Sequence, residues 1–153
     1  MSAPAGLREE VTELARQLIR IDTSNPPGNE SAAARHLAAY LAEAGVEAEL
    51  LGPDSERLNL IARIGGAGEG PSVMLMAHTD VVPAPADGWS TGPFDGTVRD
   101  GVLIGRGATD MKNELAARAV AFAALARGPE RPAGDVVLVA EADEERNVSD
   151  PVW

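Results

Sequence analysis

The sequence predicts an α/β fold with a mixed, largely parallel sheet flanked by helices. Three observations predict it. Two stretches with helical periodicity open the chain, short β-rich runs separated by polar or glycine-rich turns follow, and a long alanine-rich segment lies between the last two extended runs. With 153 residues, of which 44% are hydrophobic, the chain has the composition of one globular domain that buries a core.

The first two elements are expected to be helices. Between Leu7 and Ile21 apolar residues recur at helical spacing among charged residues, which is typical of an amphipathic helix packed on one face. This helix must end before SNPPGN, because the prolines and the glycine cannot continue it. A second helix is expected from Ser31 to Ala44, where a glycine directly follows the last residue.

Three extended runs come next, and we expect each to be a strand: VEAELL (46–51), NLIARI (59–64) and VMLMAH (73–78). In TVRDGVLI (97–104) the pair Asp100-Gly101 stands between two extended triplets. Asp and Gly tolerate the positive φ angles of the tightest turns, so this segment predicts a hairpin.

The clearest topological signal is a crossover. From Asp110 to Arg127 the chain contains no helix breaker, and Gly128 follows, which predicts a long buried helix. VVLVAEA (136–142) is then typical of a buried strand. Because strand, helix and strand occur in this order, the strands at 73–78 and 136–142 are predicted to lie parallel in one sheet with the helix across its face.

Charge and composition exclude several classes of function. Lys and Arg number 13 against 24 Asp and Glu, a net charge of -11 that would repel nucleic acid. The absence of cysteine leaves only His and carboxylates as strong metal ligands. No apolar run reaches the roughly 20 residues of a membrane span, and the N-terminal residues do not resemble a secretory signal, so we expect a cytoplasmic protein that binds neither nucleic acid nor membrane.

Polar side chains gather where the crossover unit has its ligand-binding edge. The ends of its two strands and the start of its helix meet at one edge of the sheet. The residues predicted to lie there are His78, Asp80, Asp110, Asp143, Glu144 and Glu145. Carboxylates crowded in this way repel each other unless a cation joins them, and His with Asp and Glu suits zinc.

Asp80 is expected to orient His78. The two residues are two apart on an extended segment, so their side chains point the same way, and Asp80 can accept the second imidazole N–H while the other nitrogen binds metal. Taken singly, His78, Asp110 and the acidic run each more often have a structural role, as does His36, which we expect to be merely solvated or packed. Topology alone leaves the metal site and the structural alternative evenly balanced.

A family resemblance changes that balance. The segment AHTDVVPAPADGWSTGPFDGTVRDGVLIGRGATDMK, followed by ADEE, resembles the metallopeptidase and amidohydrolase family of acetylornithine deacetylase, succinyl-diaminopimelate desuccinylase, aminoacylase and glutamate carboxypeptidase. The motifs HTDVVP, GRG, DMK and DEE stand in the order that the family has, and LIRIDTSNPPGNE is similar to its opening. The tail RNVSDPVW departs from the family pattern.

The resemblance implies a zinc exopeptidase-like fold and a role for each site residue. By it, His78 binds one zinc ion, Asp110 bridges two, Glu145 binds the second, Glu144 is the general base and Asp80 orients His78. It also implies two zinc ions per complete site, with cobalt or manganese as substitutes, and a cis peptide bond after Asp110.

The resemblance further implies that residues 1–153 are the N-terminal part of the catalytic domain, without the lid and dimerisation domain or the C-terminal part. Full-length relatives are expected to be homodimers. The expected function is hydrolysis of amide bonds in N-acyl amino acids or peptides. The alternative is a truncated, inactive remnant that acts at most as a weak metal-binding or partner-binding module.

Overall fold

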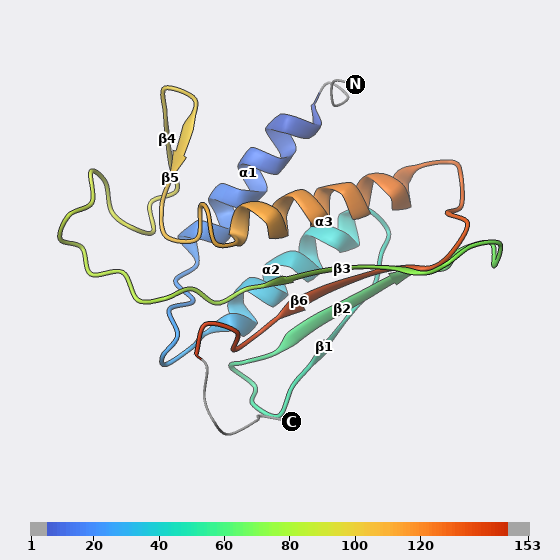
Figure 1. Cartoon of the computed structure of the whole chain (residues 1–153), viewed down its shortest axis with the longest axis horizontal. Helices are drawn as coiled ribbons and strands as arrows, with labels where there is room; N and C mark the ends of the chain where they lie inside the picture. Colours follow the sequence, from blue (N-terminus) through green and yellow to red (C-terminus); the bar gives the residue numbers. More distant parts are fainter. Residues whose placement is uncertain (1–5, 147–153) are drawn as a thin grey trace.

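The computed structural model describes residues 6–146. Figure 1 shows the helices stacked on one side of a sheet, with a small hairpin beside them. The elements, in chain order, are α1 (Leu7–Arg20), α2 (Glu30–Glu43), β1 (Ala48–Leu51), β2 (Asn59–Ile64), β3 (Val73–His78), β4 (Thr97–Arg99), β5 (Val102–Ile104), α3 (Lys112–Arg127) and β6 (Val136–Glu141).

The main sheet has four strands in the order β1-β2-β6-β3. The predicted parallel pair is confirmed, because β3 and β6 run parallel with Leu75 opposite Leu138. The α/β class and the mixed sheet are also confirmed, but the expectation of a largely parallel sheet is wrong. Both β1–β2 and β2–β6 are antiparallel, and β6 lies between β2 and β3 rather than at the edge of the sheet.

The helices cover only one face of this sheet. α2 contacts β1 and β2, α3 contacts β3 and β6, and α1 packs on α3. On the other face, large apolar side chains are exposed: Leu51, Ile61, Met74 and Met76, the last two 62% and 47% accessible. Within residues 6–146 this open face of the sheet has no covering layer.

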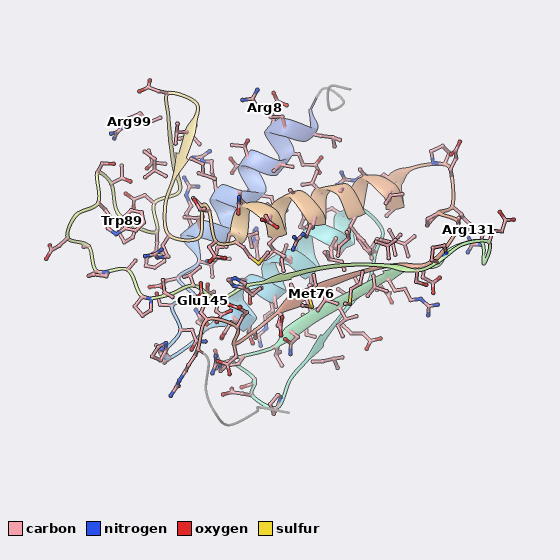
Figure 2. The ribbon with its side chains drawn as sticks, in the orientation of Figure 1. Arg8, Met76, Trp89, Arg99, Arg131 and Glu145 are labelled. Atoms are coloured by element: carbon pink, nitrogen blue, oxygen red, sulfur yellow. The ribbon has the colours of Figure 1, made fainter. Side chains whose placement is uncertain are left out.

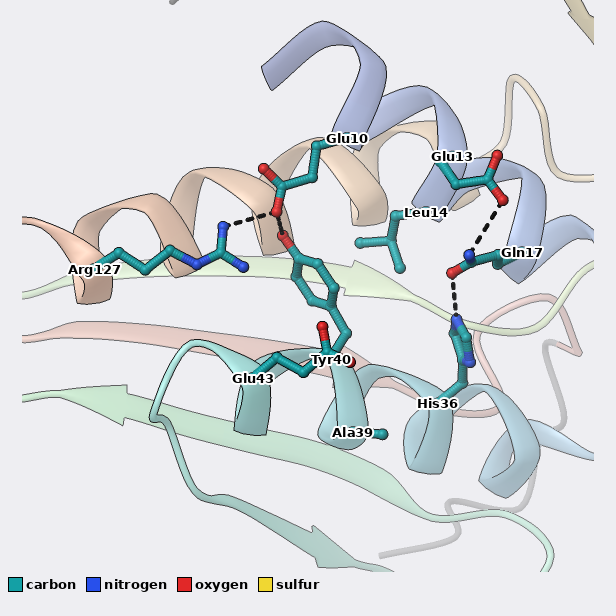
Figure 3. Close-up of a pocket in the computed structure, with 9 residues that line it drawn as sticks. All are labelled: Glu10, Glu13, Leu14, Gln17, His36, Ala39, Tyr40, Glu43 and Arg127. Carbon is teal, nitrogen blue, oxygen red and sulfur yellow. Dashed lines mark hydrogen bonds and ion pairs between the residues drawn. The ribbon is translucent and has the colours of Figure 1, made fainter. Parts of the chain in front are cut away.

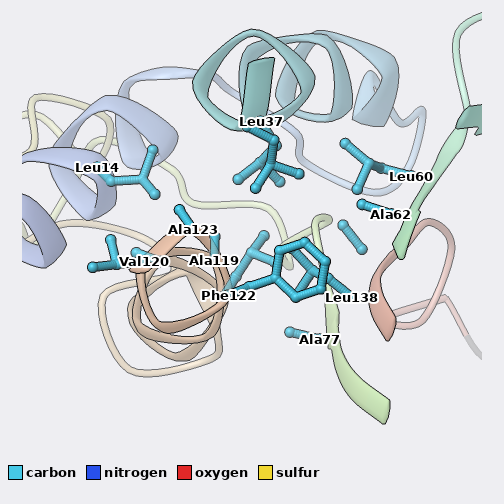
Figure 4. Close-up of a cluster of buried hydrophobic side chains, with 14 of the residues drawn as sticks. Leu14, Leu37, Leu60, Ala62, Ala77, Ala119, Val120, Phe122, Ala123 and Leu138 are labelled. Carbon is cyan, nitrogen blue, oxygen red and sulfur yellow. The ribbon is translucent and has the colours of Figure 1, made fainter. Parts of the chain in front are cut away.

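The core lies between the helices and the sheet (Figure 4). Phe122 of α3 is fully buried among small and branched side chains, including Leu37 of α2, Leu60 of β2 and Leu138 of β6. α3 is rich in alanine, and its alanines at the core are fully buried, which lets the helix pack close to its neighbours. Methyl packing around a single ring therefore fills the interior, as the 3% aromatic content predicts.

Element boundaries differ slightly from the predicted ones. The hairpin is confirmed, with Asp100 and Gly101 both at positive φ, 52° and 77°. α3 begins at Lys112, not at Asp110, because Met111 takes the N-cap position and Asp110 lies in the preceding turn. None of the helices in the described part of the chain combines the length and the apolar character that a membrane crossing requires.

Candidate metal centre

The three predicted segments meet at one end of the sheet. The Nε2 atom of His78, at the end of β3, lies 3.2 Å from Oδ1 of Asp110 and 3.7 Å from Oε2 of Glu144. Glu145 joins them, since one ligand atom each from His78, Glu144 and Glu145 lie within 4.8 Å of one another. Figure 2 shows Glu145 just beyond the end of β6. The predicted convergence of an imidazole with separated carboxylates is confirmed.

Asp80 contacts the His78 ring, and the shorter contact is through its backbone. The Nδ1 atom of His78 lies 2.9 Å from the main-chain oxygen of Asp80 and 3.5 Å from its carboxylate oxygen Oδ1. An N–H at Nδ1 therefore donates to the carbonyl oxygen rather than to the carboxylate that the sequence suggested. The ring is held so that Nε2 faces Asp110 and Glu144, which is the position a metal ligand needs.

The carboxylate of Asp80 joins two loops. Asp80 is fully buried, and it accepts hydrogen bonds from Nδ2 of Asn25 at 2.8 Å, from the backbone N–H of Glu145 at 2.9 Å and from that of Glu144 at 3.2 Å. Burial alone would raise the pKa of Asp80, but the nearby imidazole of His78 and the hydrogen bonds from Asn25 and the two amides outweigh it and lower the pKa to about 2. The side chain therefore stays ionised.

The charges around His78 favour a cation. Burial lowers the pKa of His78, but its contacts with Asp80 and Asp110 act more strongly together and raise the pKa to about 9. The pKa of Glu145 is raised, first by burial and then by Asp110, Glu144 and Asp80, despite the opposing effect of His78. One imidazole nitrogen facing crowded carboxylates is a donor set that fits a divalent metal ion such as zinc.

Lys112 fixes the start of α3 next to Asp110. It is fully buried, and its ammonium group donates hydrogen bonds to the carbonyl oxygens of Leu18 at 2.9 Å and Ile21 at 2.7 Å, at the end of α1. Burial lowers the pKa of Lys112 to about 8. The Asp110-Met111 peptide bond is cis, as the family resemblance implied. The turn that presents Asp110 is thus tied to the end of another helix.

Asn25 and Arg57 were not predicted from the sequence. Asn25 donates through Nδ2 to Asp80 and, at 2.9 Å, to Oδ1 of Asp143, while Arg57 forms ion pairs with Glu30 and Asp143. The segment SNPPGN was interpreted only as the end of a helix. Its position within a stretch similar to the family's opening was the one signal that could have pointed to Asn25.

A hollow of about 370 Å³ lies between α1 and α2 and shares no residue with this cluster (Figure 3). At one side Tyr40 and Arg127 both donate to Oε1 of Glu10 at 2.7 Å, and these bonds, that of Arg127 first, lower the pKa of Glu10. His36 lies 3.0 Å from Oε1 of Gln17 through its Nε2 atom.

The chain is similar to proteins of known sequence and of known structure. Succinyl-diaminopimelate desuccinylase of Delftia acidovorans is 41% identical over 138 residues, which are 87% of this chain and 35% of that protein. The M20 family metallo-carboxypeptidase Sso-CP2 of Sulfolobus solfataricus is 25% identical with a TM-score of 0.77, covering 89% of this chain and 31% of that one. The Bacillus subtilis YXEP protein, a dinuclear metal binding peptidase, has the same fold. It is 20% identical with a TM-score of 0.63, covering 94% of this chain and 37% of that one.

The chain spans about a third of the length of the curated relatives it matches. Residues 74–150, about half of the chain, match the sequence profile of peptidase family M20/M25/M40. The match extends past Glu145 to residue 150, within the tail that was expected to depart from the family pattern. On the strength of this match, the chain belongs to peptidase family M20/M25/M40.

Proposed function

We propose that this chain carries part of the active site of a metal-dependent hydrolase that cleaves amide bonds in N-acyl amino acids or peptides. The observation that carries the proposal is the meeting of His78 Nε2 with the carboxylates of Asp110 and Glu144, with Glu145 beside them. The name of the desuccinylase relatives suggests an N-succinyl amino acid as the first substrate to assay.

His78, Asp110 and Glu145 would hold two zinc ions, Asp110 contributing to both, and cobalt or manganese would serve as substitutes. Bound zinc supplies a Lewis acid that polarises the scissile carbonyl and makes water more acidic. Glu144 is half-exposed and 3.7 Å from the imidazole, so its carboxylate can reach a water molecule at the site. It takes a proton from the attacking water and passes it to the amine nitrogen as the C–N bond breaks.

We further propose that residues 1–153 belong to the N-terminal part of the catalytic domain of a cytoplasmic enzyme, and that the full-length relatives form homodimers. A second candidate is a metal-binding module without turnover. The open face of the sheet favours this second candidate for the chain alone, because the exposed apolar side chains of Leu51, Ile61, Met74 and Met76 need a further layer of protein.

One experiment separates the candidates and tests the roles. The purified chain is loaded with zinc, its metal content is measured by elemental analysis, and hydrolysis is assayed on a panel of N-acyl amino acids that includes N-succinyl compounds. Metal with turnover supports the hydrolase, metal without turnover supports the module, and a chain that takes up no zinc refutes both.

Variants then distinguish ligands from the base. Glu144→Gln should retain zinc and lose turnover, whereas His78→Ala should lose zinc. If Glu144→Gln loses zinc as completely as His78→Ala, Glu144 is a ligand and the assignment of the base is wrong. This outcome is a real alternative, because Glu144 lies in the closest group of potential ligands.

A further inference from the structure

Asp143 begins the loop that carries Glu144 and Glu145, and its backbone adopts a left-handed conformation with a φ of 69°. A residue other than glycine adopts this conformation at a cost of about 1 kcal/mol, so other contacts must hold it. Oδ1 of Asp143 accepts a hydrogen bond from Asn25 Nδ2 at 2.9 Å and forms an ion pair with Arg57 Nη2. The loop is therefore anchored at its first residue.

Arg57 is itself firmly held. Its Nη2 atom donates to Oε1 of Glu30 at 2.8 Å, and its Nε atom lies 3.3 Å from both oxygens of that carboxylate. Glu30 is fully buried, and the Arg57 side chain is only 18% exposed. A Cβ atom on Gly28 would lie 2.7 Å from Nε of Arg57, so the absence of a side chain at Gly28 makes room for the guanidinium. One cation thus joins the buried start of α2 to Asp143.

The other end of the loop is held by Asp80. The backbone amides of Glu144 and Glu145 donate to the two oxygens of its carboxylate. Among residues 6–146, the hydrogen bonds of the Arg57 side chain go to Glu30 and Asp143 alone. Arg57 can therefore act on the two glutamates only through Asp143.

We propose that Arg57 is a positioning residue of the metal centre, which holds Asp143 so that Glu144 and Glu145 stay in place beside His78. The part of this inference that concerns zinc binding rests on the proposed function. Removing the guanidinium leaves Glu30 buried without a cation and Asp143 with only the amide of Asn25. The loop then loses one of the two side-chain contacts that fix its start.

Four variants of the full chain test the role. Arg57→Gln removes the cation, and Arg57→Lys keeps the charge without the planar fork of donors. Arg57→Gln combined with Glu30→Gln removes the buried unpaired charge as well, so it carries the same test if the single variant fails to fold. Arg63→Gln is the control, because Arg63 pairs with Asp135 at the other end of β2 and is largely exposed.

The first measurement needs no metal. Amide hydrogen exchange is followed by NMR at Glu144 and Glu145, relative to the amides of β6. In Arg57→Gln and in the double variant, exchange at the two glutamates should become about tenfold faster while the β6 amides stay protected. The second measurement is the zinc dissociation constant, which should rise ten- to a hundredfold, as for other residues that orient metal ligands. Arg57→Lys should recover part of both, and Arg63→Gln should change neither.

Two results overturn the inference. Unchanged exchange at Glu144 and Glu145 in the double variant shows that Asp143 is held without Arg57, and equal acceleration throughout β6 shows that Arg57 only stabilises the fold. Failure of the proposed function looks different: the unsubstituted chain then binds no zinc, while the exchange rates in the metal-free chain still decide the role of Arg57.

Discussion

Asp80→Asn tests whether one buried carboxylate holds the metal centre together. Asp80 accepts three hydrogen bonds, from Asn25 and from the backbone amides of Glu144 and Glu145, at 2.8–3.2 Å. Asparagine keeps the shape but puts an NH₂ donor where one acceptor oxygen was, so it faces another donor. A hydrogen bond to a charged group contributes about 1.5–3 kcal/mol, and an unpaired buried donor costs a similar amount. We therefore expect the free energy of unfolding to fall by about 3 kcal/mol.

Urea denaturation followed by circular dichroism measures the free energy of unfolding of both proteins. The pH dependence of the difference between the two values gives a second check. The pKa of Asp80 is about 2 in the folded chain against an ordinary value of 3.8, so its contribution is present in full above about pH 4 and is lost as the pH falls toward 2. The difference between the free energies of unfolding of the two proteins should narrow as the pH falls below about 4.

Asp135→Asn is the matched control for this substitution. Asp135 is partly exposed, and its partner Arg63 lies largely in solvent, so the same change there should lower the free energy of unfolding far less than Asp80→Asn does. If the free energy of unfolding of the Asp80→Asn variant lies within about 0.5 kcal/mol of that of the original chain at pH 7, the view that Asp80 joins the two loops is refuted.

Three further substitutions test the core and the helix contacts by the same denaturation assay. Phe122→Ala removes the only aromatic side chain among the buried residues of the described core and should lower the free energy of unfolding by about 3–5 kcal/mol. A loss below about 2 kcal/mol would mean that the helices move inward and fill the cavity. Lys112→Met keeps the length of the side chain but leaves two carbonyl oxygens at the end of α1 without their donor, for an expected loss of about 2 kcal/mol, and an unchanged stability would contradict this anchoring role. Tyr40→Phe removes one hydrogen bond to Glu10 and should cost about 1 kcal/mol at neutral pH. Because the folded pKa of Glu10 is lowered, that cost should shrink as the pH falls below the ordinary value of 4.5, and a pH-independent cost would exclude the bond to the carboxylate as its cause.

Sequence patterns predicted the elements and the parallel pair of strands, because those depend on local periodicity and on one short crossover. Of the two neighbours of β6, the sequence predicted β3 but not β2. Its antiparallel pairing with β2 joins Leu60 to Ala140, and no turn or short connection between these strands reveals it. The largely parallel sheet was therefore a wrong expectation, although the position of each strand was predicted within about two residues.

The site residues that belong to the crossover unit were predictable, and those that come from distant segments of the sequence were not. His78, Asp110, Glu144 and Glu145 all lie at the ends of the crossover unit, so topology alone brings them together. Asn25 reaches Asp143 across 118 positions of the sequence, and Arg57 reaches it across 86. Contacts of that range leave no periodic signal. The backbone oxygen of Asp80 was missed for a different reason, since side-chain spacing says nothing of which atom of a residue accepts a bond.

The place of β6 in the sheet determines the order in which this molecule can assemble. β6 is the last strand of the described chain, but it lies between β2 and β3, which have no direct pairing with each other. As the polypeptide leaves the ribosome, the β1–β2 hairpin and β3 therefore remain separate until residues 136–141 have emerged. A nascent chain interrupted before that point would have His78 and Asp110 but no complete sheet to hold them. The candidate metal site should therefore form in one late step, together with the closure of the sheet.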